Sequence, residues 1–155
     1  MADTFDIEVA TPERLVFREA ATEAQIPCKN GYIGVLPGHT PLLAELGIGE
    51  LSYRTGGQTK TCTAIGGFVE VLADRVIVLA DAAERAEEID VPRAQAARER
   101  AQRRLATPNA TDVDWTRAQN ALARAEARLQ AAAKASGSSV TATGVASGAH
   151  APSHS

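Results

Sequence analysis

The 155-residue sequence has little of what many enzymes and secreted proteins depend on. It contains two cysteines, one tryptophan and one methionine, and aromatic residues make up only 4% of the chain. Cys28 and Cys62 lack metal-type spacing and are too few for a disulfide framework, so we expect two small, unpaired thiols in a reducing compartment. With so few aromatic residues, the core must rest on Val, Ile, Leu and Ala.

Further absences exclude several functions. His39 is the only histidine before residue 150, so a cupin-like metal site has no ligand set, and we expect this histidine to bond to backbone in its own turn. The sequence has no GxxxxGK[ST] loop and no serine or cysteine nucleophile paired with a base. No apolar run is long enough to span a membrane, and the first residues do not resemble a signal peptide. We expect a soluble cytoplasmic protein that is not an enzyme, needs no metal or cofactor, and meets a membrane only through another protein.

Charge is distributed unevenly along the chain. Residues 1–83 carry 6 basic and 11 acidic side chains, whereas residues 84–135 carry 10 basic and 8 acidic ones. The net charge of −3 is too mild for a protein whose main partner is nucleic acid. The local basic excess suits an acidic protein surface instead.

Residues 1–83 have the pattern of a β domain. Alternating apolar residues in 4–11, apolar runs in 48–55, 58–65, 68–72 and 76–80, and two short runs within 14–26 predict strands. Asn30-Gly31 and Gly56-Gly57 are typical hairpin turns. Short strands at such close spacing predict an antiparallel β-sandwich or flattened barrel.

The segment 31–51, GYIGVLPGHTPLLAELGIGEL, is the most distinctive part of this domain. Pro37 and Gly38 force a turn after a strand-like run, and Pro41 cannot donate to a sheet, so residues 38–41 should form a tight corner. We expect Leu42, Leu43 and Leu46 to return to the core beyond this corner.

The composition changes after residue 81 to one typical of helices. Asp90 followed by Val91-Pro92 is a helix start, and a stripe of Ala94, Ala97, Ala101 and Leu105 follows it. After a break at 107–111, a second stripe consists of Trp115, Ala118, Leu122, Ala125, Leu129 and Ala132. These stripes predict an antiparallel two-helix hairpin over 84–135. Residues 136–155 lack charge and periodicity, which predicts a disordered tail.

The hairpin should be weakly held. A seam of alanine buries little apolar area and only partly offsets the entropy lost on ordering the segment. The hairpin should therefore be able to dock on the sandwich, leave it, or pack on a partner. Its arginines are either ordinary solvated side chains or a basic face for acidic partners or phosphates.

Several motifs closely resemble the epsilon subunit family of the F-type ATP synthase (called delta in mitochondria). These are the GxLGxLPGHxPLL-like run in 31–43, GGFVEV at 66–71 with VIVLAD at 76–81, the ERAEEID junction at 84–90, and DVDW at 112–115 with ALARA at 121–125. The resemblance covers about residues 4–133. It implies a ten-stranded sandwich followed by a helical hairpin, in agreement with the pattern of the residues.

The resemblance also implies a function and partners. The chain would be a non-catalytic rotor subunit of the central stalk, coupling proton flow to ATP synthesis at the cytoplasmic face of the bacterial plasma membrane. The gamma subunit and the c-subunit ring would contact its exposed turns, Asn30, Gly31, Tyr32, Pro37, Gly38, His39, Pro41 and Leu42. The extended helices would reach the catalytic alpha/beta hexamer and inhibit ATP hydrolysis, with Arg98, Arg100, Arg103 and Arg104 as candidates for pairing with its acidic segments.

One shorter motif suggests a regulatory ligand. Residues 89–94, IDVPRA, are similar to the I/L-D-x-x-R-A pattern by which some members of this family bind ATP in the folded hairpin. The residues that the resemblance assigns to such a site are Glu84, Ile89, Asp90, Arg93, Ala94, Arg124 and Arg128. The alternative is that Asp90 only caps the helix and Arg93 is solvated.

Overall fold

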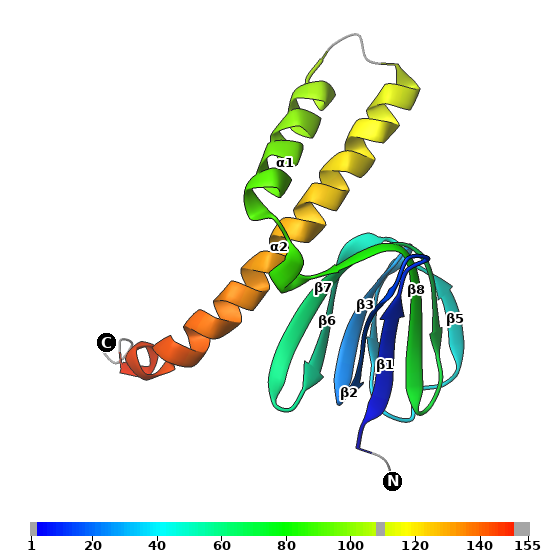
Figure 1. The fold of residues 1–155 in the computed structure, drawn as a ribbon, viewed down its shortest axis with the longest axis vertical. Coiled ribbons are helices and arrows are strands. Elements are labelled where there is room, and N and C mark those ends of the chain that lie inside the picture. Colours follow the sequence, from blue (N-terminus) through cyan, green and yellow to red (C-terminus); the bar gives the residue numbers. More distant parts are fainter. Residues whose placement is uncertain (1–2, 108–110, 151–155) are drawn as a thin grey trace.

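The computed structural model describes residues 3–107 and 111–150, with side chains described as far as residue 135. A β domain is followed by a helical hairpin that rises from one of its ends (Figure 1). The strands are β1 (Phe5–Ala10), β2 (Leu15–Ala21), β3 (Glu23–Cys28), β4 (Gly31–Val35), β5 (Leu42–Glu45), β6 (Ile48–Thr55), β7 (Gln58–Val71) and β8 (Arg75–Arg85). The helical elements are the single 3₁₀ turn η1 (Ala86–Glu88), α1 (Val91–Leu105) and α2 (Asp112–His150).

The predicted sandwich is confirmed, and its two longest strands belong to both layers. The first halves of β7 and β6 pair with each other, whereas the second half of β7 pairs with β5. β8 follows β7 along both halves, and β3 and β4 extend the layer of β6. Inward-facing residues of both layers form one core, made mainly of valine, isoleucine, leucine and alanine as predicted.

The described strands number eight, not the ten that the resemblance implied. One strand fewer arises at Gly66-Gly67, where the predicted strands 58–65 and 68–72 are joined in the single strand β7. Both glycines have positive φ, 64° and 106°, and the chain passes through them as an irregularity within β7. A Cβ on Gly67 would lie 2.0 Å from the carbonyl oxygen of Leu79, so only glycine allows β8 to pass so close. The glycine pair therefore turns β7 from one layer to the other without interrupting its pairing.

The sheet is also not wholly antiparallel. β1 pairs in parallel with the first half of β8, with Ile7 opposite Val76 and Val9 opposite Val78. The two strands are separated by most of the domain, so no short turn dictates their relative direction. Sequence alternation identifies both as strands but carries no information about this pairing.

The region 31–51 forms the expected turn but not the expected core contacts. The Pro37-Gly38 turn is fixed by hydrogen bonds from the Gly38 amide to the Ala73 carbonyl and from the His39 amide to the Leu36 carbonyl. Leu46 is buried, but Leu42 and Leu43 are 39% and 70% exposed. They are exposed because β5 is an edge strand, and Leu43 lies on its outward side.

Both cysteines are free, as predicted. Cys62 is buried in the core, and this burial raises the pKa of its thiol to about 12. Cys28, at the end of β3, is partly buried, which also raises its pKa. Both shifts favour the unreactive thiol form.

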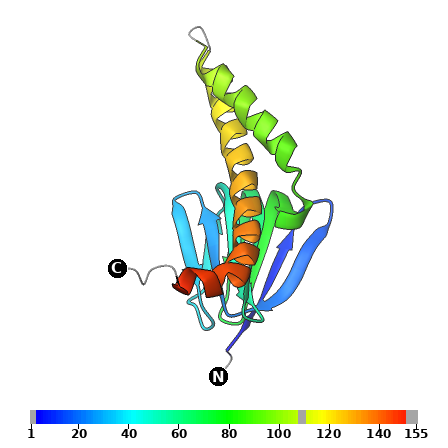
Figure 2. The same cartoon turned by 90° about the vertical axis from the view of Figure 1, so that its left-hand side faces the viewer.

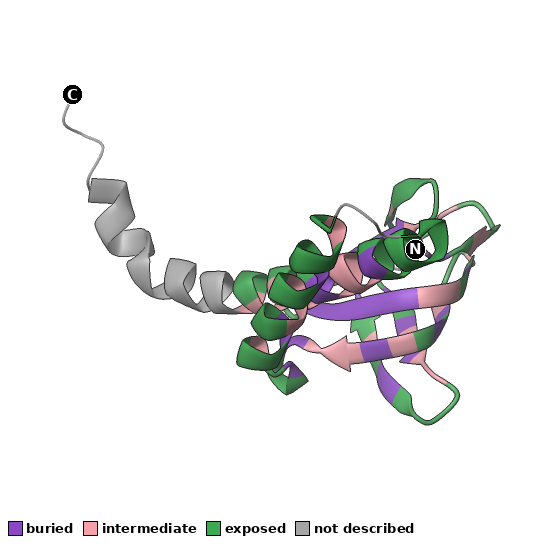
Figure 3. Ribbon diagram, turned by 90° about the horizontal axis from the view of Figure 1, so that it is seen from above, coloured by how far each residue is buried: buried purple, intermediate pink, exposed green. Residues whose placement is uncertain are grey.

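The hairpin is present as predicted, with Ala94 and Ala101 of α1 and Ala118 and Ala125 of α2 buried. Trp115 was expected in this seam, but it is 43% exposed. Exposed residues dominate the outer surface of α1, as Figure 3 shows.

α2 runs from Asp112 to His150, past residue 135, where we expected the hairpin to end. Once a helix exists, each further residue adds a hydrogen bond without a new nucleation cost, so low helix propensity need not stop it. Residues 151–155 lie outside the described residues.

The hairpin is docked on the sandwich through α2, which lies across β6 and β7 (Figure 2). Ala127 and Ala131 are buried on this side of the helix. The Thr61 hydroxyl donates to the Ala131 carbonyl at 2.8 Å, and Lys134 Nζ lies 2.6 Å from the Glu50 carboxylate. The contact between α2 and the sandwich is therefore made of alanine and polar groups. Undocking of α2 would expose little apolar surface.

Candidate functional site

A cavity of about 590 Å³ lies between the two helices and the end of β8. Its residues come from the junction after β8, from α1 and from α2. They are Glu84, Glu88, Asp90, Arg93, Ala94, Ala97, Arg100, Ala101, Arg104, Ala121, Arg124 and Arg128. Small alanine side chains on both helices leave room for it, and arginines supply most of its polar groups.

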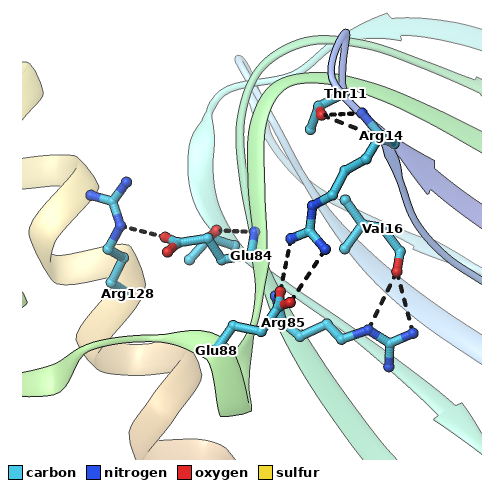
Figure 4. Close-up of polar contacts among 8 residues, drawn as sticks. Thr11, Arg14, Val16, Glu84, Arg85, Glu88 and Arg128 are labelled. Carbon is cyan, nitrogen blue, oxygen red and sulfur yellow. Dashed lines mark hydrogen bonds and ion pairs between the residues drawn. The ribbon is translucent and has the colours of Figure 1, made fainter.

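Two glutamates at the junction point to different partners (Figure 4). Glu84 Oε1 accepts a hydrogen bond from Arg128 Nε of α2 at 2.6 Å, and the Glu84 amide donates to the Thr63 hydroxyl at 2.9 Å. This ion pair ties α2 to the last strand of the sandwich at the base of the cavity.

Glu88 is held from the opposite side. Its two carboxylate oxygens accept hydrogen bonds from Arg14 at 2.9 and 3.2 Å, and Oε1 also accepts from the Arg85 amide. The hydrogen bond from Arg14 is the main reason that the pKa of Glu88 is lowered. These bonds fix η1 against the loop between β1 and β2, so the hairpin starts from a defined position.

Asp90 is the helix cap that one of the two alternatives predicts, and it also lines the cavity. Its carboxylate accepts a hydrogen bond from the Arg93 amide at 3.1 Å, and Pro92 occupies the first turn of α1, as expected of a helix cap. Capping therefore does not remove Asp90 from the candidate site.

The structure brings together all but one of the residues that the sequence assigned to an ATP site. Ile89 does not line the cavity and is buried beside it. Sequence reasoning missed Glu88 and the alanines Ala97, Ala101 and Ala121, and it assigned Arg100 and Arg104 elsewhere. The 3–4 spacing of positions 93, 97, 100 and 104 on one face of α1 was the available signal.

The turn residues proposed as partner contacts lie in two places, at the start of β4 and in the corner after it. β4 separates Asn30 and Gly31 from Pro37 and Gly38, at a length of about 3.3 Å per strand residue. The His39 ring Nδ1 contacts the Thr40 carbonyl oxygen at 2.6 Å, which is the local backbone bond expected of this histidine.

A second surface, which the sequence did not reveal, is an exposed apolar face. It lies on the layer that contains β5, away from α2; Figure 1 shows the position of that layer. Phe68 of β7 lies opposite Leu79 of β8, and Leu43 of β5 lies diagonally across from Phe68. All three side chains are more than half exposed. The neighbouring outward positions include three glutamates, Glu8, Glu45 and Glu70, and two apolar residues, Ala10 and Ile77. We call the three residues Leu43, Phe68 and Leu79 the apolar face.

The glutamate buried beneath α2 suggests a test of docking. Glu50 is 6% exposed, Oε1 is paired with Lys134, and Oε2 has no hydrogen-bond partner within the described part of the chain. We expect Lys134→Ala to weaken docking by about 1–3 kcal/mol, because it leaves a buried carboxylate unpaired. Amide hydrogen exchange in α2 should accelerate while that in the sandwich core stays unchanged.

The matched control is Lys134→Ala combined with Glu50→Gln. The neutral amide costs less to bury than the carboxylate, so the double variant should recover part of the slow exchange. Equal exchange in wild type and Lys134→Ala would show that the ion pair does not hold the helix.

These features define a class of protein: a β-sandwich with an exposed apolar face, joined to a helical hairpin with a basic cavity between its helices. The described residues contain no group of three or more His, Cys, Asp or Glu able to hold a metal ion. No helix in the described part of the chain is long and apolar enough to cross a membrane.

Comparison with known families identifies the particular one. Residues 4–86 match the family model described as ATP synthase, Delta/Epsilon chain, beta-sandwich domain, and residues 87–133 match the long alpha-helix domain of the same chain. The chain belongs to the ATP synthase delta/epsilon family, and it is thus a non-catalytic subunit of that complex.

Curated relatives agree with this assignment. The ATP synthase epsilon chain of Koribacter versatilis is 58% identical over 107 residues, covering 69% of this chain and 75% of the relative. That of Syntrophobacter fumaroxidans is 53% identical over 135 residues, covering 86% and 99%.

Solved structures share the fold. A chain in the Euglena gracilis mitochondrial ATP synthase, a structure of OSCP, F1 and the c-ring, has a TM-score of 0.73 and 24% identity, covering 85% of this chain and 82% of that one. A chain of the Tetrahymena thermophila mitochondrial ATP synthase, in a structure of the central stalk and c-ring, has a TM-score of 0.57 and 13% identity, with coverage of 83% and 96%.

Proposed function

We propose that the chain is a rotor subunit of the central stalk, which couples proton flow through the c-ring to ATP synthesis and restrains ATP hydrolysis through its hairpin. The observation that carries this proposal is the pairing of a rigid docking face with a weakly held hairpin in one chain. The related chains in stalk and c-ring structures support it. In a bacterium this places the chain at the cytoplasmic face of the plasma membrane, bound there through the complex.

The apolar face is the proposed main contact with the gamma subunit. An apolar centre with a polar rim is the usual anatomy of a protein interface. Glutamates at the neighbouring positions favour a partner with basic side chains around its own apolar patch. The corner at Pro37, Gly38, His39, Pro41 and Leu42 leads directly into β5 and extends this contact.

The turn at Asn30, Gly31 and Tyr32 is the proposed contact with the c-subunit ring. Gly31 has a φ of 120°, which fixes a sharp turn between β3 and β4, and Tyr32 is exposed beside it. Short turns on a rigid sandwich are well suited to docking because they lose little entropy on binding.

The helices are the proposed contact with the alpha/beta hexamer. Arg100, Arg103 and Arg104 of α1 are exposed and Arg98 is half-buried, so most of these guanidinium groups are accessible to acidic segments. The alanine-rich contact of α2 with the sandwich favours release of the hairpin, because little apolar area is lost from it. An extended hairpin would then block rotation in the direction of hydrolysis.

Removing the hairpin tests this division of roles. We expect a chain ending at residue 88, which keeps the Arg14–Glu88 contact, to bind gamma as tightly as the full chain. We expect the shortened chain no longer to inhibit ATP hydrolysis when it is added to a catalytic sector depleted of this subunit. The measurement is ATPase activity titrated with each chain, alongside gamma binding. Inhibition by the shortened chain, or by neither chain, would refute an inhibitory hairpin.

A second proposed activity is ATP sensing in the docked hairpin. The cavity favours it, because five arginines line a concave site whose base includes the capped start of α1. ATP bound there would stabilise the docked form and so shift the population away from the extended one. Arg93, Arg124 and Arg128 are the proposed phosphate contacts, with Glu84, Asp90 and Ala94 shaping the site and Ile89 packing behind it.

Arg93→Ala tests ATP binding. The Arg93 side chain has no ion-pair partner among the described residues, and only its amide bonds to Asp90, so the helix cap survives the change. We expect ATP affinity to fall at least tenfold, which corresponds to about the free energy of one charge-assisted hydrogen bond. The thermal midpoint of the sandwich should be unchanged. Isothermal titration of the isolated chain measures it. Equal affinities for wild type and variant would exclude Arg93 as an anchor.

A further inference from the structure

The polar contacts that dock α2 follow one row of residues across the sandwich. Glu50 of β6 lies opposite Thr63 of β7, and Thr63 lies opposite Glu84 of β8. The two glutamates are therefore two strand spacings apart, about 10 Å. Their partners in α2 are Lys134 and Arg128, and the helix rises by about 9 Å between these positions. The matched spacings let one helix reach both carboxylates.

The ion pair at the Glu50 end of this row is uneven. Glu50 is 6% exposed, whereas the side chain of Lys134 is 59% exposed. Oε1 of Glu50 lies 2.6 Å from Lys134 Nζ, and Oε2 has no hydrogen-bond partner among the residues that the structure describes. The strength of such a pair depends on how far water is kept from the carboxylate, because the attraction between opposite charges rises as the local dielectric constant falls.

Tyr32 of β4 lies next to this ion pair. Its ring packs over β6 at Gly49, the residue before Glu50, where a Cβ would lie 2.8 Å from the Tyr32 hydroxyl oxygen. The absence of a side chain at Gly49 therefore allows the phenol to come this close. The pKa of Tyr32 is raised, first by partial burial and then by the Glu50 carboxylate, whereas a hydrogen bond with the Glu50 backbone and the charge of Lys134 act to lower it. Both charges of the pair thus act on the phenol.

The rest of the Tyr32 side chain is open to solvent. The residue is 54% exposed and follows Gly31 in the turn that is the proposed contact with the c-subunit ring. A tyrosine suits such a shared position, since its ring can enter an apolar contact while its hydroxyl stays beside polar groups. One side chain therefore belongs both to the proposed c-ring contact and to the surroundings of the ion pair that docks α2.

We propose that Tyr32 couples these two sites: it shields the Glu50–Lys134 ion pair from water, and a c-subunit ring bound at the turn strengthens the docking of α2. This inference rests on the proposed c-ring contact and adds a regulatory role to it. Covering Tyr32 lowers the dielectric constant around the ion pair, which strengthens the pair. It also raises the cost of leaving Glu50 without its cation when α2 departs. By linkage, a docked hairpin favours c-ring binding to the same extent.

Amide hydrogen exchange of α2 in the full chain tests the shielding. We expect Tyr32→Ala to accelerate exchange in α2 by about threefold or more, because water then reaches the Glu50 carboxylate and screens its pair. Tyr32→Phe keeps the ring and should have a smaller effect. The matched control is Leu36→Ala, because Leu36 is 61% exposed and lies just past the other end of β4. This change should leave exchange in α2 as it is in wild type.

A double-mutant cycle separates shielding of the ion pair from a general structural effect. If Tyr32 acts through the pair, Tyr32→Ala should add little in a chain that already carries Lys134→Ala. Equal acceleration by Tyr32→Ala in both backgrounds would overturn the proposal. Exchange in Tyr32→Ala that is no faster than in Leu36→Ala would overturn it as well.

The second measurement uses the chain bound to gamma, with and without the detergent-solubilised c-subunit ring. We expect the ring to slow exchange in α2 by about threefold or more in wild type, but not in Lys134→Ala. Ring binding with unchanged or faster exchange in α2 would overturn the coupling and leave the c-ring contact intact. Absence of ring binding to wild type, or undiminished binding to Tyr32→Ala, would refute the contact itself, and the coupling with it.

Discussion

Replacing Gly67 by alanine should prevent the sandwich from folding stably. The residue has a φ of 106°, which costs an L-residue about 1–2 kcal/mol, and its new Cβ would lie 2.0 Å from the Leu79 carbonyl oxygen. Relieving this overlap requires β7 and β8 to separate where the chain passes between layers. We expect a loss of at least about 3 kcal/mol in the free energy of unfolding, a large part of the stability of a small domain. Urea unfolding followed by circular dichroism measures it.

Gly57→Ala is the matched control for this prediction. Gly57 also has a positive φ, 78°, but a Cβ there meets nothing within 4 Å. Gly57→Ala should therefore lower the free energy of unfolding only by the cost of a positive φ, about 1–2 kcal/mol. If the two variants were equally destabilised, the close approach of β8 would not be the reason for glycine at position 67.

Phe68→Glu should abolish binding to the gamma subunit while leaving the chain folded. Phe68 is the centre of the apolar face, 56% exposed, with Leu79 opposite it on β8 and Glu45 opposite it on β5. The change removes an aromatic contact and places a second negative charge beside Glu45. A central interface residue of this kind contributes about 2 kcal/mol or more, so affinity should fall at least about 30-fold. Surface plasmon resonance with immobilised gamma measures it.

Val113→Glu provides the comparison for Phe68→Glu. Val113 is also apolar and 61% exposed, but it belongs to α2 of the hairpin and not to the sandwich that carries the apolar face. It should bind gamma as wild type does. A similar loss in both variants would indicate a general effect of added negative charge, and no loss in either would place the gamma contact elsewhere.

Much of the fold could be predicted from local patterns. Alternation located the strands, Asn30-Gly31 and Gly56-Gly57 marked two hairpins, and Asp90 with Pro92 located the start of α1 within a residue. These features depend on neighbours in the chain, which the sequence contains directly. The prediction was wrong at Gly66-Gly67, where we expected one strand to end and another to begin. These two glycines instead form a bend within β7.

The candidate sites were less accessible to sequence reasoning. The residues proposed for ATP binding were named from a motif. That Arg100 and Arg104 also line the cavity was missed, because a helix has several faces and only packing decides which one meets α2. The apolar face was missed because Leu43 was expected in the core, and Phe68 and Leu79 were recognised only as strand residues. Their exposure depends on which side of each strand the second layer covers.

The sequence by itself determined the two-part organisation: a β domain without catalytic groups, then an alanine- and arginine-rich hairpin with a defined start. Backbone propensity, turn chemistry and capping act over a few residues, so they can be recognised from the sequence alone. Tertiary structure alone decided that β7 and β8 belong to both layers, that α2 docks over Glu50, and that arginines of both helices line one cavity. These arrangements arise because burial and ion pairing depend on contacts between residues far apart in the chain, and no local pattern encodes them.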